Sequence, residues 1–509
     1  MTDAAARPPL RLHTKVSYGL GSVAQSVAGV ALSAAIINFY LVRVIGLRPE
    51  LVGVVLFLSL AIDAVLDPVI GRWSDNFRSR WGRRHPFMYA SAVPVGLAIY
   101  FLWHPPRGLP DTALAAFMFV MLVVLRLCVS LYQIPSDALT PELAPDYHER
   151  TGLISYRYFF GIAGGVVMTV ILLDVFIPKD HAHPLGFLNR EGYAQFGLLA
   201  AIVVFVSIVV SSMSTHRYIP YLSRAPQRRQ SVVQSTREIV ATLGNPSLIV
   251  VMLSGLFSGI AGGLAGSLGN FINVYFWGLT PQVVSLLVVF TAPAYILGVV
   301  LAPALSRALD KKRTMITVFF LSIFTGVIPI TLRLVGLMPP NGSPWIPAIL
   351  IVDGFVAGSL ALIGFVIISS MIADVVEDSA VKTGVRSEGL LFAANGLLPK
   401  FTTGIGGMVG NLMLVAAHFP TGVHKGGPVD FVDPSIMRHL VLLSMPTSVV
   451  LNSIAVSVLI FYRIDRSSHE RNLETLAQAA AFADAGLEHD PEAGITLGGP
   501  AVKPVQPFG

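Results

Sequence analysis

The stretch of sequence that decides the fold is residues 51–86, LVGVVLFLSLAIDAVLDPVIGRWSDNFRSRWGRRHP. Its first part, residues 51–70, is almost wholly apolar and carries only two charged residues, Asp63 and Asp67. A helix of roughly 20 such residues is long enough to cross about 30 Å of hydrocarbon. The stretch therefore predicts a membrane-spanning helix followed by a basic loop.

Asp63 and Asp67 lie four residues apart, so a helix places both carboxyl groups on one face. A charge near the bilayer centre costs about 2.5–3.5 kcal/mol, and such residues normally face a wet cavity on an ion or substrate path. We therefore interpret the pair as a cation site, which would suit either Na⁺ or H⁺. The alternative is a structural role, in which the carboxylates pair with Arg72 or stabilise the helix end. Pro68 favours that alternative, because proline biases the preceding residue away from helical geometry.

The rest of the chain has the same apolar character. Hydrophobic residues make up 54% of the 509 and charged residues only 13%, which indicates an integral membrane protein. The apolar runs are long and continuous, as in helices, and lack the alternation of barrel strands. We predict an all-α membrane protein with twelve transmembrane helices, at approximately 16–44, 50–71, 86–103, 112–136, 152–174, 194–213, 247–276, 281–303, 313–335, 345–375, 387–418 and 437–462.

The predicted spans fall into two groups of six, separated by a polar stretch rich in Arg, Gln and Ser. The basic loop at 71–84 has a shorter counterpart at 306–313 in the second group. Paired six-helix halves with a substrate site between them are the architecture of the major facilitator class. The predicted units are an N-terminal half (1–213), a cytoplasmic linker (214–246), a C-terminal half (247–466) and a flexible cytoplasmic tail (467–509).

Lys and Arg collect in alternate connections, including the basic loop, the linker and the segment after the last span. The positive-inside rule then places both termini in the cytoplasm, and we expect a bacterial inner membrane. This asymmetry and contact with anionic membrane lipid explain the net charge of +6, so nucleic-acid binding is not expected. The single cysteine, Cys128, excludes an intrachain disulfide.

The fourth predicted span carries a polar stripe at helical spacing: Arg126, Ser130, Gln133 and Asp137. Such a stripe lines either a cavity or a contact between helices, and both interpretations stay open for Ser130 and Gln133. For Arg126 we favour the cavity, because an always-charged guanidinium needs water or a counter-ion.

Three further charges lie inside predicted spans: Arg157, Asp353 and Lys400. Lys400 is too deep for its ammonium group to reach the headgroups easily. It should therefore meet a carboxylate such as Asp63 or Asp67, or contact the substrate. Arg157 either reaches the inner headgroups or lines the site, and Asp353 is expected near the outer surface.

Several strings carry a family resemblance. They are Asp63-Ala-Val-Leu-Asp67-Pro68, then Gly71, Ser74-Asp75 and Arg78-Ser-Arg80-Trp81-Gly82-Arg83-Arg84, with Pro141-Glu142-Leu143, Tyr156-Arg157-Tyr158, Met371-Ile-Ala-Asp374 and Arg386-Ser-Glu388-Gly389. With these strings the chain closely resembles the glycoside-pentoside-hexuronide:cation symporter family over nearly its whole length except the tail. The resemblance implies a major facilitator fold, alternating access, and sugar uptake driven by Na⁺, Li⁺ or H⁺.

Together with the positions above, the resemblance implies three groups of functional residues and no cofactor. Cation binding is expected for Asp63, Asp67, Ser130 and Gln133. Substrate binding is expected for Gln25, Ser26, Arg126, Asp137, Arg157, Phe365, Asn395 and Lys400. Gating or conformational roles are expected for Asp75, Arg80, Arg83, Arg84, Glu142, Arg150, Asp374 and Arg386. The only metal expected is a coupling Na⁺, with H⁺ as the alternative ion.

Four positions depart from the pattern of the best-known family members. Ser26 and Gln25 replace an aspartate and a lysine, Gln133 replaces a carboxylate, and Asp137 replaces a tryptophan that stacks on the sugar. These changes remove the usual means of holding galactoside hydroxyls, so melibiose is not expected as the substrate. Arg126 adds a cation near Arg157 and Lys400, which favours an anionic substrate such as a hexuronide.

We therefore predict a monomeric secondary transporter that takes up a sugar or sugar acid together with a cation. One alternative keeps the fold but carries a lysophospholipid with Na⁺, as distant relatives do. Another is a non-transporting membrane sensor, which would bind a ligand without moving it. An enzyme is not expected, because no nucleophile, base and metal constellation can be assembled.

Overall fold

The computed structural model describes residues 9–181, 183–222, 245–383, 396–421 and 431–464, together with 468, 471, 472, 474 and 475. All regular structure in these ranges is helical. The N-terminal half contains α1 (Leu12–Ala31), α2 (Ala34–Phe39), η1 (Tyr40–Ile45), α3 (Pro49–Asn76), α4 (His85–Trp103), α5 (Asp111–Leu143), α6 (Tyr147–Val170), η2 (Ile171–Phe176), α7 (Arg190–His216) and η3 (Ile219–Tyr221). The C-terminal half contains α9 (Pro246–Phe271), η4 (Ile272–Phe276), α10 (Pro281–Leu309), α11 (Lys311–Leu334), α12 (Trp345–Thr383), α14 (Leu398–Ala416) and α15 (Pro434–Leu459).

The predicted all-α membrane fold is confirmed. Eleven helical runs in the described ranges are long and apolar enough to cross a membrane, and they coincide with eleven of the predicted spans. The remaining prediction, 387–418, is described from residue 396 onward, where α14 has 19 residues. Residues 387–395 lie outside the described ranges, as does 223–244, most of the predicted linker.

Local chemistry explains where many of these helices begin. Asp146, Asn189, Asn245 and Asp433 precede α6, α7, α9 and α15, and each accepts a hydrogen bond from a backbone N–H in the first turn. Proline occupies the first position of α3, α9, α10 and α15, where its missing N–H costs no helical hydrogen bond. These caps place the helix starts in the connections between spans.

Three predicted spans are interrupted or continue past a proline in the structure. The first span is interrupted between α1 and α2 and ends in the π-helical turn η1. α3 continues through Pro68 to Asn76, so the proline does not end the helix and Asp67 stays within it. α5 likewise continues through Pro135 and Pro141 to Leu143. In membrane helices, neighbouring groups can satisfy the backbone carbonyl that a proline leaves free.

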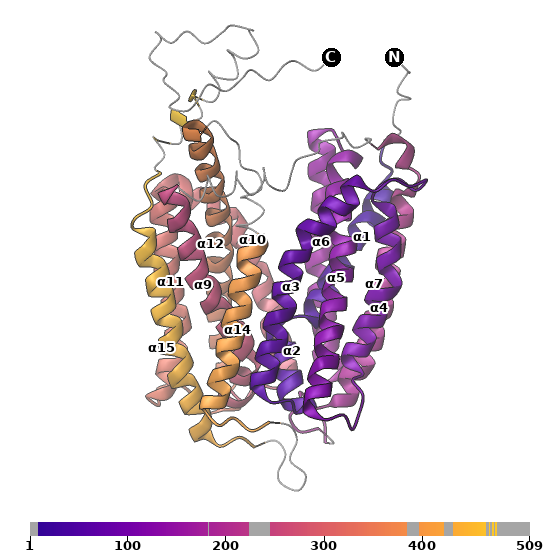
Figure 1. The fold of residues 1–509 in the computed structure, drawn as a ribbon. Coiled ribbons are helices and arrows are strands. Elements are labelled where there is room, and N and C mark those ends of the chain that lie inside the picture. The colour runs from indigo at the N-terminus through magenta and orange to yellow at the C-terminus, as the bar shows by residue number, and fades with distance from the viewer. Residues whose placement is uncertain are drawn as a thin grey trace, which may run out of the picture.

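The two halves stand side by side as two helical bundles (Figure 1). α1 begins and α15 ends at the same end of the molecule, which we call the terminal end; α2 and η1 lie at the opposite, far end (Figure 1). The halves lie closer together at the far end than at the terminal end (Figure 1). Between these ends, α14 packs against both α9 of its own half and α3 of the other. The α3–α14 contact therefore joins the halves.

The main apolar core extends from the N-terminal half across the far end into α9, α14 and α15. Phe39 at the end of α2 packs on Phe271 at the end of α9, with ring centroids 5.1 Å apart. Phe271 in turn contacts Phe419, which follows α14, at 5.2 Å. A second apolar cluster lies within the C-terminal half, around Leu248, Met315 and Met371. The shared core holds the two halves together at the far end.

Candidate functional site

The centre of the candidate site is a lysine from one half that bridges two carboxylates of the other. Lys400 Nζ on α14 lies 2.7 Å from Asp63 Oδ2 and 2.5 Å from Asp67 Oδ2, both on α3. The Asp63 side chain is 7% exposed, whereas those of Asp67 and Lys400 are 30% and 26% exposed. The inner carboxylate is thus buried, and the outer one and the ammonium group remain partly accessible.

Small residues allow α3 and α14 to approach closely enough for this bridge. A Cβ atom on Gly404 of α14 would meet the Phe57 ring of α3 at 3.0 Å. A Cβ atom on Gly53 of α3 would meet Asn411 of α14 at the same distance. Glycines at such positions let membrane helices pack backbone against side chain. The bridge is therefore built by helix packing as well as by charge.

Two residues of the polar stripe on α5 complete the carboxylate cluster. Ser130 Oγ donates a hydrogen bond of 2.7 Å to Asp67 Oδ1 and lies 3.4 Å from Asp63 Oδ1. Arg126 Nη1 lies 3.7 Å from Asp63 Oδ2. The Arg126 Nε–H is buried without a hydrogen-bond partner in the described part of the chain. Two carboxylates are thus balanced by one ammonium and one guanidinium group, and the guanidinium is incompletely satisfied.

The position of the Lys400 ammonium group has a direct chemical meaning. It is a monovalent cation held between two carboxylates with a serine hydroxyl beside them. Hard monovalent cations prefer the same oxygen ligands. The space between the two carboxylates is therefore one whose oxygen ligands suit a monovalent cation, and in this structure the ammonium group fills it.

A second polar cluster surrounds Arg157 on α6. Arg157 Nη1 donates to the Tyr18 hydroxyl at 2.8 Å, and Arg157 Nη2 donates to Asp137 Oδ1. The Tyr18 hydroxyl also contacts the Ser136 carbonyl oxygen at 2.5 Å and Thr140 Oγ1 at 2.9 Å. Arg157 therefore makes these contacts within the protein. The Asp137 side chain is 52% exposed.

The remaining predicted ion- and substrate-binding residues are more scattered. Gln133 lies one helical turn before Asp137 on α5 and so borders the arginine cluster. Ser26 packs against Gly161 and Gly165 of α6, and Gln25 is exposed. Phe365 is 61% exposed and lines a cavity of the C-terminal half. Asn395 lies outside the described residues.

The residues predicted to act in gating form ion pairs within each half at the terminal end. Glu142 on α5 pairs with Arg83 and, at 3.0 Å, with Arg84, and Arg84 also contacts Asp75 at 3.4 Å. In the C-terminal half Lys311 pairs with Asp374 at 2.7 Å. In the N-terminal half the pairs connect α5 to the loop between α3 and α4. In the C-terminal half the pair connects α12 to the start of α11. The other members are Arg150, which donates to the carbonyl of Ala144; Arg80, which lies over the Trp81 ring; and Arg386, which is outside the described residues.

Contacts at the far end were not predicted from the sequence. Arg43 of η1, whose residue surface is 2% exposed, donates to the Tyr275 hydroxyl at 2.7 Å and to the Pro420 carbonyl at 3.1 Å. Asn38 donates to the Ser267 carbonyl at 2.9 Å, and Ser285 donates to Asp174 at 2.8 Å. Each bond joins the two halves. Only its burial in the structure reveals the role of Arg43.

Sequence reasoning also missed three members of the arginine cluster. Ser136 and Thr140 lie four residues apart on α5, next to the polar stripe, and Tyr18 faces them from α1. The spacing of Ser136 and Thr140 could have extended the stripe by another turn. The contribution of α1 depends on how the helices pack, so no local pattern pointed to it.

Comparison with known proteins agrees with this architecture. The family model described as MFS/sugar transport protein matches residues 17–466. An uncharacterized symporter of Synechocystis is 32% identical over 41% of this chain and 37% of its own length, so the match spans little more than a third of that relative. The isoprimeverose transporter of Lactiplantibacillus pentosus is 22% identical over 80% of each chain.

A solved structure has the same fold. The crystal structure of a D-xylose-proton symporter superposes with a TM-score of 0.60, covering 89% of this chain and 98% of that one. The sequences are only 15% identical, so the likeness concerns the fold alone. It confirms the predicted two-half major facilitator architecture.

Proposed function

The chain belongs to the MFS/sugar transport protein family, and from this premise we propose that it is a cation-coupled symporter of a sugar or sugar derivative. The family supports secondary active transport of a small molecule by a membrane protein, and it is a family of transporters, not of enzymes. The coupling ion, the substrate class and the orientation are our proposals.

The observation that carries the proposal is the bridge from Lys400 to Asp63 and Asp67. A cation that binds between the two carboxylates competes with the lysine for the same oxygens. Ion binding would therefore release the ammonium group and loosen a contact between the halves. The released lysine, which is partly exposed, could then contact oxygen atoms of a substrate. Ion and substrate would each raise the affinity for the other, which is the thermodynamic meaning of coupling.

The arginine cluster supplies the chemistry for a hydroxylated substrate. Arg157, Asp137 and the Tyr18 hydroxyl offer donors and acceptors close together, with Asp137 partly exposed. Sugar hydroxyls both donate and accept, so they match such a mixed surface. Charge-assisted hydrogen bonds of this kind are stronger than neutral ones. The cluster favours a sugar over a purely apolar cargo.

The unsatisfied Arg126 Nε–H favours a substrate that carries negative charge. A buried guanidinium donor without a partner is costly, and an anionic oxygen would remove that cost. We therefore propose a sugar acid such as a hexuronide ahead of a neutral glycoside. Strong uptake of neutral glycosides that survives Arg126→Ala would exclude this choice while leaving the symport proposal intact.

We assign the terminal end to the cytoplasm, because the basic loop 71–84 and the Lys311 and Lys312 region lie there. The far end, where the halves are joined by Arg43 and the phenylalanine core, then faces the outside. On this assignment the structure represents a state closed to the exterior, in a bacterial inner membrane.

Purified protein in proteoliposomes tests the function directly. We would screen labelled glycosides, pentosides and hexuronides under an imposed Na⁺ gradient and, separately, under a pH gradient. One class of sugar should accumulate above its external concentration with one of the two gradients. Ligand binding without accumulation under any gradient would support a sensor, and accumulation of lysophospholipid alone would support the lipid-carrying alternative. Either result would overturn the proposal.

A further inference from the structure

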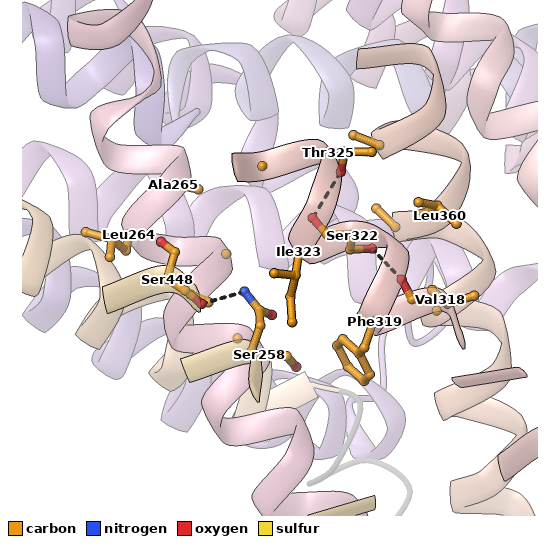
Figure 2. A pocket seen from close by; sticks show the side chains of 18 of the residues that line it. Ser258, Leu264, Ala265, Val318, Phe319, Ser322, Ile323, Thr325, Leu360 and Ser448 are labelled. Atoms are coloured by element: carbon orange, nitrogen blue, oxygen red, sulfur yellow. Dashed lines mark hydrogen bonds between the residues drawn. The ribbon is translucent and has the colours of Figure 1, made fainter. Parts of the chain in front are cut away.

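The C-terminal half contains a partly open cavity of about 600 Å³ whose lining includes none of Asp63, Asp67 and Lys400. Its walls come from α9, α11, α12 and α15, with the first turns of α14, and every residue lining it belongs to the C-terminal half. Figure 2 shows Ser258, Phe319, Ser322, Ile323 and Ser448 around this space. The cavity thus lies inside one half, whereas the proposed substrate residues Asp137 and Arg157 lie in the other.

The walls of the cavity are mainly apolar and locally open. Lining residues on α9 extend from Val251 to Ile272, which is about 30 Å along a helix, so the space is elongated along the bundle. Glycines leave parts of the wall without side chains: a Cβ atom on Gly262 or Gly326 would meet no atom within 4 Å. An apolar cavity of this size inside a packed protein is a characteristic ligand-binding volume.

Asp353 is the one charged residue among those that line the cavity. It lies on α12, and its carboxylate makes no hydrogen bond or ion pair with any described residue of the chain. It lies in the third turn of α12, which begins at Trp345. An unpaired carboxylate beside an apolar space attracts positive charge.

Several of the other polar groups of the cavity use a donor within their own helix. Ser258 donates to Gly255 O, Ser322 donates to Val318 O at 2.8 Å, and Asn452 donates to Ser448 O at 2.9 Å, all within their own helices. What these groups still offer to a ligand is mostly acceptor oxygen atoms. The cavity therefore combines apolar walls, acceptors and one carboxylate, which excludes anions and does not suit a neutral sugar.

We propose that this cavity is a second binding site, for a lipophilic monovalent cation. The apolar body of the ligand packs among the side chains of α9, α11 and α15, and its positive charge lies near Asp353. Leu398, Pro399 and Thr402 also line the cavity, so a bound ligand touches the helix that carries Lys400. Phe365, which the sequence assigns to substrate binding, is the one predicted substrate residue that also lines this cavity among the described residues.

The test uses the full-length purified protein in lipid nanodiscs and radiolabelled tetraphenylphosphonium as the probe. We expect saturable binding to the unaltered protein. Asp353→Asn keeps the shape of the side chain but removes its charge, and should weaken binding about tenfold, equivalent to about 1.4 kcal/mol. The anionic isostere tetraphenylborate controls for partition into lipid and should show no saturable binding.

Variants that fill the cavity provide an independent arm. Gly262→Leu and Gly326→Leu place a side chain in the open space and should each reduce tetraphenylphosphonium binding at least about tenfold, because the added side chain takes up volume that the ligand needs. Gly152→Leu is the matched control, since Gly152 also has no neighbour within 4 Å and does not line the cavity. It should bind the probe normally.

Any of three outcomes, the first two of which concern the cavity itself, would overturn the inference. One is the absence of saturable binding to a protein whose thermal unfolding and gel-filtration profile are normal, and another is equal affinity in the protein with Asp353→Asn. The third is loss of binding with Asp67→Asn but not with Asp353→Asn, which would place the cation at the carboxylate pair. Failure here leaves the symport proposal untouched, because that is tested by gradient-driven sugar accumulation.

Discussion

Lys400 connects charge balance to the relative position of the two halves. Its ammonium group lies within 2.7 Å of both Asp63 Oδ2 and Asp67 Oδ2 across the α3–α14 contact. Buried ion pairs add little net stability, because desolvation offsets much of the attraction. A pair that can be exchanged for a bound ion is better understood as a switch. Two predictions at the scale of single residues follow from this interpretation.

Asp67→Asn should abolish concentrative uptake while the protein remains folded. The change keeps the size of the side chain but removes the more accessible of the two carboxylates that would hold the ion. The measurement is gradient-driven sugar accumulation in proteoliposomes. Asp111→Asn is the matched control, because its pair with Arg48 is exposed on both sides and exposed pairs contribute little. Full accumulation with Asp67→Asn would refute the assignment of the ion site.

Lys400→Gln should separate ion binding from coupling. Without the ammonium group the carboxylates have no internal competitor, so the apparent affinity for the coupling cation should rise by about tenfold, or about 1.4 kcal/mol. Sugar accumulation should nevertheless be lost, because ion binding no longer releases a contact between the halves. Isothermal titration with the cation and uptake assays measure the two effects. Weaker ion binding in this variant would mean that Lys400 supports the ion site instead of competing for it.

At the scale of elements, the two halves are joined at the far end by contacts between η1 and the segments that follow α9 and α14. Arg43 donates from η1 to Tyr275 and to Pro420 O, and its guanidinium also lies over the rings of Tyr275 and Phe419 at 5.3 and 5.8 Å. The residue is almost fully buried, so these contacts are not weakened by water. They favour the state in which the far end is closed.

Arg43→Ala should shift the protein toward states that are open at the far end. Truncating one partner of a buried, charge-assisted contact costs about 2 kcal/mol or more, enough to change the population at least about tenfold. A cysteine pair at Ala35 and Gly269 reports closure, because a Cβ atom on Gly269 would lie 3.6 Å from the Ala35 Cβ atom. Cross-linking of this pair should slow at least about tenfold with Arg43→Ala.

The control for that experiment lies within one half. A cysteine pair at Ala294 and Gly358 has the corresponding separation, 3.5 Å, between α10 and α12. Its cross-linking should be the same with and without Arg43→Ala, in a background where Cys128 is replaced by serine. An equal slowing of both pairs would indicate general destabilisation and contradict a specific role for Arg43.

At the scale of the whole molecule, the two halves are joined at the far end and by α3–α14, and the terminal-end ion pairs are internal to each half. Alternating access requires the far end to open at some point in each cycle. Locking it should therefore stop transport without disturbing the ion site.

Oxidation of the Ala35→Cys and Gly269→Cys pair should reduce uptake to near background, and reduction with dithiothreitol should restore it. Cation binding should persist in the oxidised protein, because the carboxylates lie away from the cross-link. Uptake before and after reduction, with cation titration of the oxidised form, measures both. Undiminished uptake in fully cross-linked protein would exclude rocking of the halves as the transport motion.

The sequence by itself determined the fold class and much of the candidate site. Continuous apolar runs of about 20 residues specify helices, because hydrocarbon leaves the backbone no other way to satisfy its hydrogen bonds over such lengths. The spacing of Asp63 and Asp67 specified a shared helix face, and the depth of Lys400 required a carboxylate or substrate nearby. Each of these features depends on a single helix and its surrounding hydrocarbon, so it can be predicted without knowing how the helices pack.

Only the tertiary structure decided which residues meet across helices. Tyr18 joins Arg157, Arg43 reaches Tyr275, and Asp353 lines a cavity of the C-terminal half. The continuation of α3 through Pro68 also depends on neighbours, which the proline rule for a single chain does not include. Such contacts join residues more than 100 positions apart in several cases, so they are set by the packing of helix faces and not by any periodicity along the chain.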